Sequence, residues 1–241
     1  MTETEPVRLG SFPPGGVAVV FGATGGLGSA LATAIARSGR FSRLCALSRT
    51  NDPAFDLMDE ESIERAARHA AALGEIRLVV DATGFLHDAS QKPEKTWRDI
   101  SLETMSHALA LNTIGPALIM KHVLPQLPSS GKAVFATLSA RVGSIDDNRL
   151  GGWYSYRASK AALNQIVRTA AIELKRNRPD AICVSLHPGT VDTPLSQPFA
   201  RRGLQVQAPS ASAAHLMSVI DSLKPEDTGR FFDWRGDPVP W

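Results

Sequence analysis

Two side chains four residues apart, Tyr156 and Lys160, have the chemistry and the spacing of a proton-transfer pair. Residues at this spacing share one face of a helix, about one turn apart. A free tyrosine has a pKa of about 10, and a nearby ammonium group stabilises the phenolate and lowers that pKa. Tyr156 could then donate a proton to a carbonyl oxygen or remove one from an alcohol. The other tyrosine, Tyr154, falls on a different helical face, so the spacing selects Tyr156.

A serine hydroxyl near this pair would help to orient a substrate oxygen by hydrogen bonding. Ser139 stands at the end of the apolar stretch that precedes the Tyr156 segment. We therefore expect Ser139 to act together with Tyr156 and Lys160.

A glycine-rich turn follows the first apolar stretch, residues 17–21. Glycine has no Cβ, so it permits a sharp strand-to-helix turn and lets backbone N–H groups approach a pyrophosphate at the positive end of a helix. The spacing of the glycines differs from the common G-x-G-x-x-G pattern, but their place in the first strand-helix unit favours phosphate binding over a simple tight turn. The predicted dinucleotide loop consists of Gly22, Thr24, Gly25, Gly26, Leu27 and Gly28.

The end of the second apolar stretch, residues 43–48, indicates which dinucleotide binds. A carboxylate at this place would bond the ribose hydroxyls of NAD, whereas an arginine accepts the 2′-phosphate of NADP. Arg49 stands here, and the first acidic residue after it is Asp52. We therefore expect NADP(H), with NAD less favoured. The alternative interpretation of Arg49 is a solvated surface side chain.

Short apolar stretches alternate with longer segments of helical periodicity, which is typical of repeated strand-helix-strand units. Strands are expected at residues 17–21, 43–48, 77–82, 132–139, 181–187 and 230–234. Helices are expected at residues 26–38, 59–73, 101–124, 152–177 and 211–223. The strands are apolar on both faces, as when helices cover both sides of a parallel sheet. The predicted fold class is α/β: a single-domain, Rossmann-like, doubly wound parallel sheet with helices on both faces.

No repeat and no linker rich in Pro, Gly or Ser divides the sequence, so we expect one dinucleotide-binding and catalytic domain over residues 17–241. Residues 1–16 are polar and rich in Pro and Gly, which predicts a flexible N-terminal segment. Residues 50–59 are short and polar, so a strand usually expected there is vestigial or absent. Residues 194–209 lack clear periodicity and predict a loop or lid.

Composition argues against several classes of partner. The 241 residues are 43% hydrophobic and 21% charged, which is typical of a globular chain. A formal net charge of +2 without a long basic run disfavours nucleic-acid binding. The N-terminus lacks the pattern of a signal peptide, and no apolar run approaches the roughly 20 residues that span a bilayer. We expect no membrane partner and a cytoplasmic location.

Two other chemistries are also disfavoured. Cys45 and Cys183 each lie in an apolar stretch, which predicts buried, reduced side chains and disfavours a disulfide framework. None of the six histidines has a partner at metal-ligand spacing, so no metal site is expected. The G-x-S-x-G pattern of a nucleophile elbow is absent, which disfavours acyl transfer.

These motifs occur in an order that resembles the short-chain dehydrogenase/reductase family, and the similarity extends from Val17 to the C-terminus. The stretches at residues 139–145, 151–164 and 230–241 resemble its C-factor-like carbonyl reductase branch in particular. The further matching positions are Asp56, Leu57, Ala82, Thr83, Gly84, Asn112 and the segment His187, Pro188, Gly189, Thr190, Val191, Asp192, Thr193 and Pro194.

The resemblance implies roles for several of these residues. Asn112 would hold the water and lysine positions of a proton relay, and Lys160 would also bond the nicotinamide ribose. Pro188, Val191 and Thr193, with Gly189 between them, would contact the nicotinamide end. The resemblance further implies a seven-stranded sheet and a homodimer or homotetramer, often joined through the long helices or the last strand.

Three departures from the family pattern stand out. The family usually has the motif Asn-Asn-Ala-Gly, whereas residues 81–84 of this chain are Asp-Ala-Thr-Gly. We therefore expect one polar contact near the central strand to be lost. The catalytic serine normally stands three residues before a glycine, which here is Ala140; Ser139 is preferred and Ser144 is the alternative. The short segment 50–59 leaves the adenine contact by Asp56 open.

The resulting expectation is an NADP(H)-dependent oxidoreductase that interconverts a small carbonyl compound and its alcohol by hydride transfer. Tyr156 would be the general acid and base, assisted by Lys160, Ser139 and Asn112. The alternative is a dinucleotide-binding signalling protein of the C-factor type with little turnover. A nucleotide-sugar epimerase is less favoured, because the chain lacks the length for an extra substrate domain.

Overall fold

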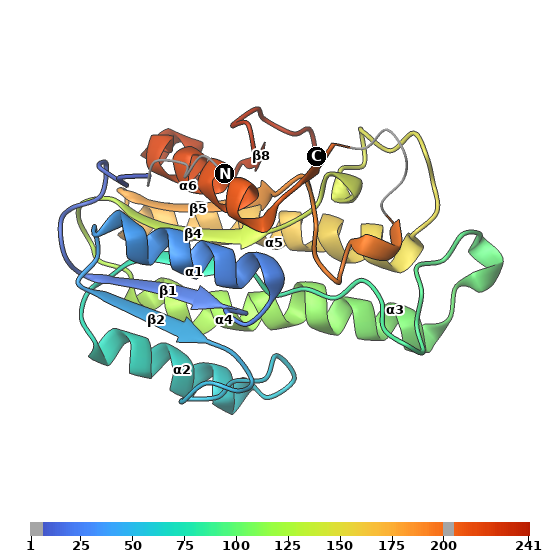
Figure 1. Ribbon diagram of the computed structural model, residues 1–241, viewed down its shortest axis with the longest axis horizontal. Helices are drawn as coiled ribbons and strands as arrows, with labels where there is room; N and C mark the ends of the chain where they lie inside the picture. The colour runs from blue at the N-terminus through green and yellow to red at the C-terminus, as the bar shows by residue number, and fades with distance from the viewer. Residues whose placement is uncertain (1–6, 200–204) are drawn as a thin grey trace.

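The computed structural model describes residues 7–199 and 205–241. Its centre is a parallel sheet with the strand order β2-β1-β3-β4-β5-β8 (Figure 1). The strands are β1 (Val17–Phe21), β2 (Arg43–Leu47), β3 (Ile76–Asp81), β4 (Ala133–Leu138), β5 (Ala181–His187) and β8 (Phe231–Asp233). The doubly wound α/β fold predicted from the sequence is confirmed.

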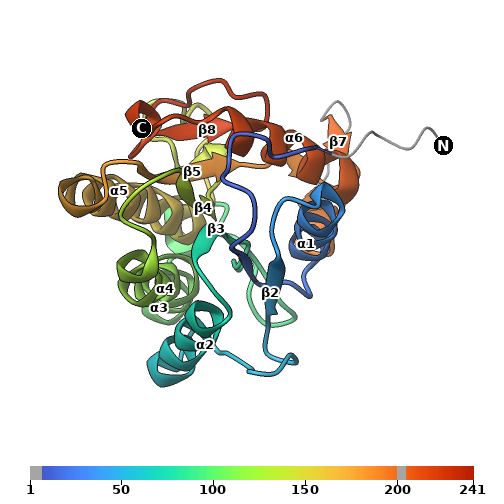
Figure 2. The same ribbon diagram turned by 90° about the vertical axis from the view of Figure 1, so that its left-hand side faces the viewer.

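Helices cover both faces of this sheet, so its strands are buried on both sides. Figure 2 shows α1 and α6 on one face and α2, α4 and α5 on the other. All residues of β1 and of β4 are buried, and one apolar core lies on each face. The helices are α1 (Gly26–Ser38), α2 (Glu60–Ala72), α3 (Leu102–Leu109), α4 (Gly115–Val123), α5 (Tyr154–Asn177) and α6 (Pro209–Ser222).

The central sheet has six strands within the described residues, rather than the seven that the family resemblance implies. The missing strand is the one expected between β2 and α2. There the chain turns back at once, because the backbone N–H of Phe55 donates to the carbonyl of Ser48 at 3.1 Å. Residues 50–59 are therefore a short connection, and β2 forms an edge of the sheet.

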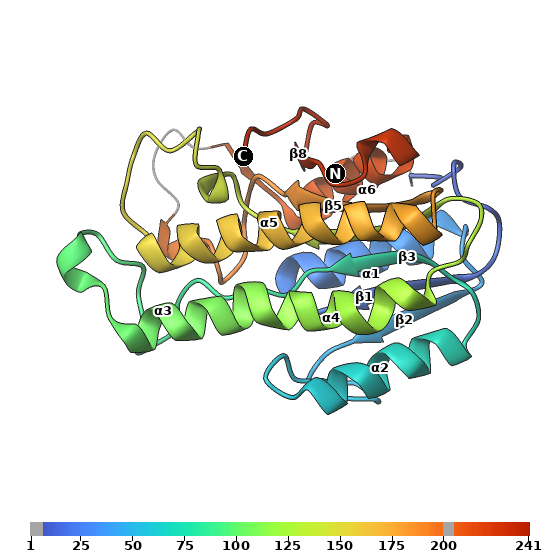
Figure 3. The same ribbon diagram turned by 180° about the vertical axis from the view of Figure 1, so that it is seen from behind.

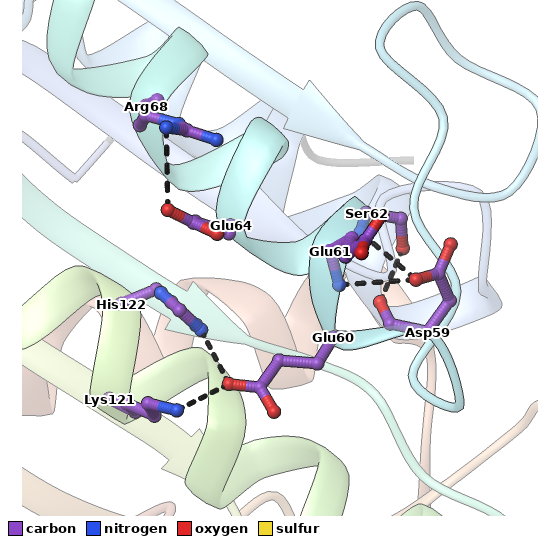
Figure 4. Close-up of polar contacts among 8 residues, drawn as sticks. All are labelled: Asp59, Glu60, Glu61, Ser62, Glu64, Arg68, Lys121 and His122. Carbon is purple, nitrogen blue, oxygen red and sulfur yellow. Dashed lines mark hydrogen bonds and ion pairs between the residues drawn. The ribbon is translucent and has the colours of Figure 1, made fainter.

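Polar contacts fix α2 against α4 across the surface of the molecule (Figure 4). Asp59 caps the start of α2 by accepting from the backbone N–H groups of Glu61 and Ser62. Glu60 accepts from Lys121 at 2.5 Å and from His122 at 3.0 Å, and these contacts lower the pKa of its exposed carboxyl group. Since exposed ion pairs contribute little to stability, the apolar face of α2 remains the main anchor.

The single helix expected at residues 101–124 is divided. α3 passes into a π-helical turn, Ala110–Ile114, and then into α4. At Gly115, the first residue of α4, a Cβ would lie 2.8 Å from a methyl carbon of Leu57, which packs over this point. A π-turn shifts the helical register by one residue, and such turns are frequent at functional sites.

Residues 7–16 do not form the flexible segment expected from their composition. Leu9 and Phe12 are buried in the core on the α1 and α6 face, and Phe12 packs edge-on against Phe41 with ring centroids 5.4 Å apart. The side chain of Arg40 donates to the Phe12 carbonyl. Apolar burial of Leu9 and Phe12 therefore outweighs the Pro and Gly content. Residues 1–6 lie outside the described part of the chain.

The segment expected to be a loop or lid contains short regular pieces. A 3-10 turn spans Gln197–Phe199, and β7 (Val206–Gln207) pairs in parallel with β6 (Thr190–Val191). α6 then begins at Pro209. Residues 200–204 lie outside the described chain.

Other expectations concern single residues. Cys45 and Cys183 are free thiols and buried, as predicted. Within residues 7–199 and 205–241, no helix is long and apolar enough to cross a membrane. The same part of the chain contains no group of three or more His, Cys, Asp or Glu side chains placed to hold a metal ion.

Candidate active site

The candidate site residues gather where the carboxyl ends of the parallel strands meet, the usual ligand-binding edge of such a sheet. The glycine turn follows β1, Arg49 follows β2, and Ala82 follows β3. Ser139 follows β4, and Pro188 follows β5. Figure 3 shows the other contributors, α5 and the α3–α4 segment, running side by side along one face.

The glycine turn brings α1 directly against the end of β1. Gly22 has a φ of +79°, and a Cβ on Gly28 would lie 2.1 Å from the Gly22 carbonyl oxygen. Only glycine at both places allows this approach. Gly25 is the N-cap of α1 and makes no side-chain cap bond, and the first turn has no acidic residue. The exposed positions here are Thr24, Gly25 and Gly26, with Leu27 half-buried behind them.

Lys160 is held by the end of β4. Its ammonium Nζ donates to the Leu138 carbonyl at 2.9 Å and lies 5.9 Å from the centroid of the Tyr156 ring. Burial lowers the pKa of Lys160 to about 8, while the negative charge of Asp81 acts in the opposite direction. Tyr156 and Lys160 are thus brought together on α5, as the spacing predicts.

The lowered pKa expected of Tyr156 is not found. Burial raises the pKa of the Tyr156 phenol to about 12, instead of the ammonium lowering it. The ammonium of Lys160 donates to the Leu138 carbonyl and is itself desolvated, so burial governs the pKa of the neutral phenol. The protonated phenol, a potential acid, is therefore the resting form.

The two candidate serines differ in how their hydroxyl groups are used. Ser139 is 3% exposed, and its Oγ has no hydrogen-bond partner among the described residues. Ser144 is also buried, but its Oγ donates to the Trp241 carbonyl at 3.3 Å and accepts from the Asp147 backbone at 3.1 Å. A buried hydroxyl without a partner is costly, so the site around Ser139 favours an incoming acceptor.

Asn112 lies fully buried in the π-turn. Its Oδ1 accepts from the Phe85 backbone at 2.7 Å, and its Nδ2 donates to the Phe85 carbonyl at 2.8 Å. Both groups of the side chain thus hold the loop that follows β3. At Gly84, a Cβ would lie 3.6 Å from both Asn112 Oδ1 and Lys160 Nζ, so this glycine borders the same space.

Asp81, where the family usually has asparagine, makes several polar contacts at the end of β3. Asp81 is fully buried, accepts from Thr83 Oγ1 at 2.6 Å and backbone N–H at 3.0 Å, and accepts from Thr137 at 2.7 Å. Thr83 supplies a hydroxyl and a backbone donor to this carboxyl, so the Asp81 side chain is fully hydrogen-bonded within the described residues. Burial nevertheless raises the pKa of Asp81, against these hydrogen bonds and the charge of Lys160.

An open cleft of about 270 Å³ lies beside the end of β2, lined in part by Arg49, Asp56 and Arg65. Arg49 is exposed there. The carboxylates in the cleft already have partners: Asp56 accepts from the Met58 backbone at 2.8 Å, and Asp59 caps α2. Leu57 is turned away from the cleft toward Gly115.

The segment after β5 lies against the glycine turn. Gly189 has a φ of +79°, and the Pro188 carbonyl accepts from Ser212 at 2.8 Å. Val191 is buried, and a Cβ on Gly26 would lie 2.9 Å from the Thr193 methyl group. This close approach places the Pro188–Thr193 segment next to the start of α1.

Sequence reasoning missed a group of aromatic side chains near Tyr156. The Trp153 ring lies 5.0 Å from Phe199 and 6.1 Å from Tyr156, and His87 lies 5.2 Å from Phe199, all between ring centroids. His87 Nε2 is 3.2 Å from the Pro194 carbonyl oxygen. The position of Trp153 near Tyr156 in sequence was an available signal, whereas His87 and Phe199 meet only through the fold.

Comparisons with known proteins agree with this arrangement. C-signal of Myxococcus xanthus is 39% identical over 144 residues, which cover 59% of this chain and 82% of that protein. The 1-hydroxy-2-glutathionyl-2-methyl-3-butene dehydrogenase of Rhodococcus sp. (strain AD45) is 33% identical over 198 residues, covering 82% and 83%.

Solved structures share the fold over almost the whole chain. An NADPH-bound carbonyl reductase from chicken fatty liver matches with a TM-score of 0.80 and 25% identity, covering 95% of this chain and 99% of that one. Carbonyl reductase Sniffer of D. melanogaster matches with a TM-score of 0.79 at 22% identity, covering 95% and 100%. The family model for short chain dehydrogenase matches residues 16–204, so the chain belongs to this family of oxidoreductases.

Proposed function

We propose that this protein is an NADPH-dependent reductase of small carbonyl compounds, with Tyr156 as general acid, Lys160 and Ser139 as its assistants and Asn112 as a support. One observation carries the proposal. The buried Ser139 hydroxyl has no partner among the described residues, and it stands one residue beyond the carbonyl that holds Lys160. A carbonyl oxygen of a substrate would satisfy that hydroxyl.

The glycine turn fits a dinucleotide. The start of α1 has no side-chain cap and no carboxylate, so its N–H groups and positive dipole end suit a pyrophosphate. Arg49 suits a 2′-phosphate, Asp56 the adenine end, and Pro188 to Thr193 the nicotinamide end. NADPH would supply a hydride to the carbonyl carbon.

The side chains of this chain would carry the proton. Ser139 donates a hydrogen bond to the substrate oxygen and holds it near the Tyr156 hydroxyl. Tyr156, protonated because of its raised pKa of about 12, gives its proton to that oxygen as negative charge develops. The Lys160 ammonium stabilises the phenolate that remains. Asn112 keeps the loop after β3 in place around this space.

The relatives support this choice of reaction. One is described as a dehydrogenase, and one solved structure is described as an NADPH-bound carbonyl reductase. The similarity to C-signal favours a second candidate, a protein that binds the dinucleotide for signalling with little turnover. Tyr156 and the unpartnered Ser139 favour the enzyme, since dinucleotide binding alone would not need them.

A paired measurement tests the proposal. NADPH binding is measured by calorimetry, and NADPH oxidation is followed with a panel of small aldehydes, ketones and quinones. We expect binding together with turnover of at least one carbonyl class. Binding without turnover across the panel would favour the signalling candidate, and absence of NADPH binding would contradict both.

A further inference from the structure

The helix that carries Tyr156 and Lys160 begins without a capping side chain of its own. Its N-cap residue is Trp153, which makes no side-chain cap bond and has a φ of +55°. Gly151 and Gly152 before it have φ values of +63° and +67°. A left-handed backbone is unfavourable for a bulky residue such as tryptophan, so surrounding contacts must hold this turn in place.

Glu94, from the loop between β3 and α3, supplies the missing cap. Its carboxylate accepts from the Ser155 backbone N–H at 3.2 Å and also from the Ser155 hydroxyl. Its own backbone carbonyl accepts from the Trp153 N–H at 2.6 Å. Glu94 is only 5% exposed, so these bonds compensate for its burial. A residue 61 positions away thus satisfies the first turn of α5.

The backbone carbonyl groups of the turn that precedes α5 are held by a different side chain, Arg157. The Arg157 guanidinium donates to the carbonyls of Gly151 and Gly152, and to Val142. Glu94 therefore occupies the N–H groups and Arg157 occupies the carbonyl groups. Neither side chain lies within ion-pair distance of the other among the described contacts, so each can be changed without directly unpairing its counterpart.

Tyr156 directly follows the capped residue, Ser155. Its ring also touches the Trp153 indole, whose backbone Glu94 fixes. Lys160, one turn later, has an independent anchor in the Leu138 carbonyl. A change at Glu94 should therefore move the phenol more than the ammonium group.

We propose that Glu94 is a positioning residue for Tyr156: from a distant loop it caps the first turn of α5 and fixes where the phenol meets the substrate oxygen. This inference rests on the proposed function. Glu94 touches neither substrate nor cofactor, and it acts only through Ser155 and Trp153. The same loop carries Phe85, held by Asn112, so the cap also ties this loop to the catalytic helix.

The experiment compares Glu94→Ala and Glu94→Gln in the wild-type chain and in a Tyr156→Phe background, with single-turnover rates measured at saturating NADPH. Misplacing a reacting group by about 1 Å costs on the order of 100-fold in rate, so Glu94→Ala should lower the single-turnover rate by about that factor. Its affinity for NADPH should stay unchanged. Glu94→Gln should recover most of the rate, because its amide can accept from the N–H and donate to the hydroxyl.

In the Tyr156→Phe background, Glu94→Ala should cause no further loss, because there is no phenolic proton left to position. Glu103→Ala, at an exposed acidic residue of α3, is the matched control and should keep the wild-type rate. If Glu94→Ala does not fold, Ser155→Ala removes the hydroxyl that donates to Glu94 and serves for the same comparison.

Two results would overturn the inference: an unchanged single-turnover rate in Glu94→Ala, or an equal loss of rate in both backgrounds, which indicates a general structural role. Both are separate from failure of the proposed function. That failure appears as a wild-type rate in Tyr156→Phe alone, before Glu94 is changed.

Discussion

Within the proposed catalytic pair of Tyr156 and Lys160, the charge of Lys160 is the one that responds to pH near neutrality. Burial lowers its pKa to about 8, and the buried carboxyl of Asp81 opposes that shift. Tyr156, which shares the site, has a pKa raised to about 12 and stays protonated over the usual assay range. As pH rises, the Lys160 ammonium therefore loses its proton before the Tyr156 phenol does.

We expect kcat/KM for carbonyl reduction to fall as pH rises through about 8, because Lys160 then loses the charge that stabilises the Tyr156 phenolate. Asp81→Asn removes a negative charge that favours the ammonium, so the fall should move to lower pH. Asp88→Asn, on the exposed loop after β3, is the control and should leave the profile unchanged. An identical profile in Asp81→Asn would contradict this electrostatic coupling.

Arg49 carries the predicted choice between dinucleotides. Hydrogen bonds between charged groups contribute about 1.5–3 kcal/mol, so Arg49→Ala should weaken NADPH binding by roughly 10- to 100-fold. NADH lacks the 2′-phosphate, and its affinity should stay the same. Calorimetric titration of both cofactors measures this, with Arg43→Ala at the exposed start of β2 as control. An equal loss for both cofactors, or tighter NADH binding in the parent, would exclude this role.

Among the structural elements, the turn between β1 and α1 depends on glycines, because a Cβ atom would not fit where the two elements meet. Gly28 faces the Gly22 carbonyl where a Cβ would lie at 2.1 Å, and the neighbouring atom is rigid backbone. Overpacking of this kind usually costs about 1–3 kcal/mol. Relief would require α1 to move away from β1 and would displace the N–H groups proposed to bind the pyrophosphate.

Gly28→Ala should therefore lower the free energy of unfolding by about 1–3 kcal/mol and should also abolish NADPH binding. Chemical denaturation and calorimetry give the two readouts. Gly10→Ala is the matched control, since a Cβ there meets nothing within 4 Å. Normal NADPH affinity in a folded Gly28→Ala protein would show that the approach of α1 to β1 is not needed for binding.

Elements with strong periodicity were predictable from sequence, whereas contacts between distant loops were not. The expected ranges of β1, β5 and α1 match the structure, because apolar runs and glycine boundaries define them locally. The π-turn around Asn112 lies inside a continuous helical pattern and leaves no local signal. Glu94 likewise has no local signal, because its partner Ser155 lies 61 positions away in the sequence. The Pro- and Gly-rich neighbours of Phe12 predict a flexible segment, so its burial could not be predicted from the local sequence.

For the whole molecule, the surface of the long helices is the feature most relevant to assembly. Ile114 and Ile172 are 54% and 50% exposed, on two helical segments that run side by side (Figure 3). The C-terminal ending expected to join copies is mostly used within the chain, because Phe231 and Phe232 are buried. Trp241, 43% exposed, is a large hydrophobic side chain of this ending that remains at the surface. We propose that self-association uses the helical surface around Ile172.

Sedimentation velocity at micromolar concentration should show a species larger than 25.8 kDa. Ile172→Asp should shift it toward the single chain, because a charge in an apolar interface is costly to bury. Met58→Asp, at an exposed apolar residue of the β2–α2 connection, is the control. A parent protein that sediments as a 25.8 kDa species would contradict association.

The central proposal is that the Tyr156 hydroxyl delivers the proton during carbonyl reduction. The most direct measurement is the single-turnover rate of NADPH oxidation by Tyr156→Phe and Tyr154→Phe, with any carbonyl that the parent reduces. Loss of general acid catalysis costs roughly 10²- to 10⁴-fold, so Tyr156→Phe should fall by that factor with NADPH affinity intact, while Tyr154→Phe keeps the parent rate. A parent rate in Tyr156→Phe would contradict the claim.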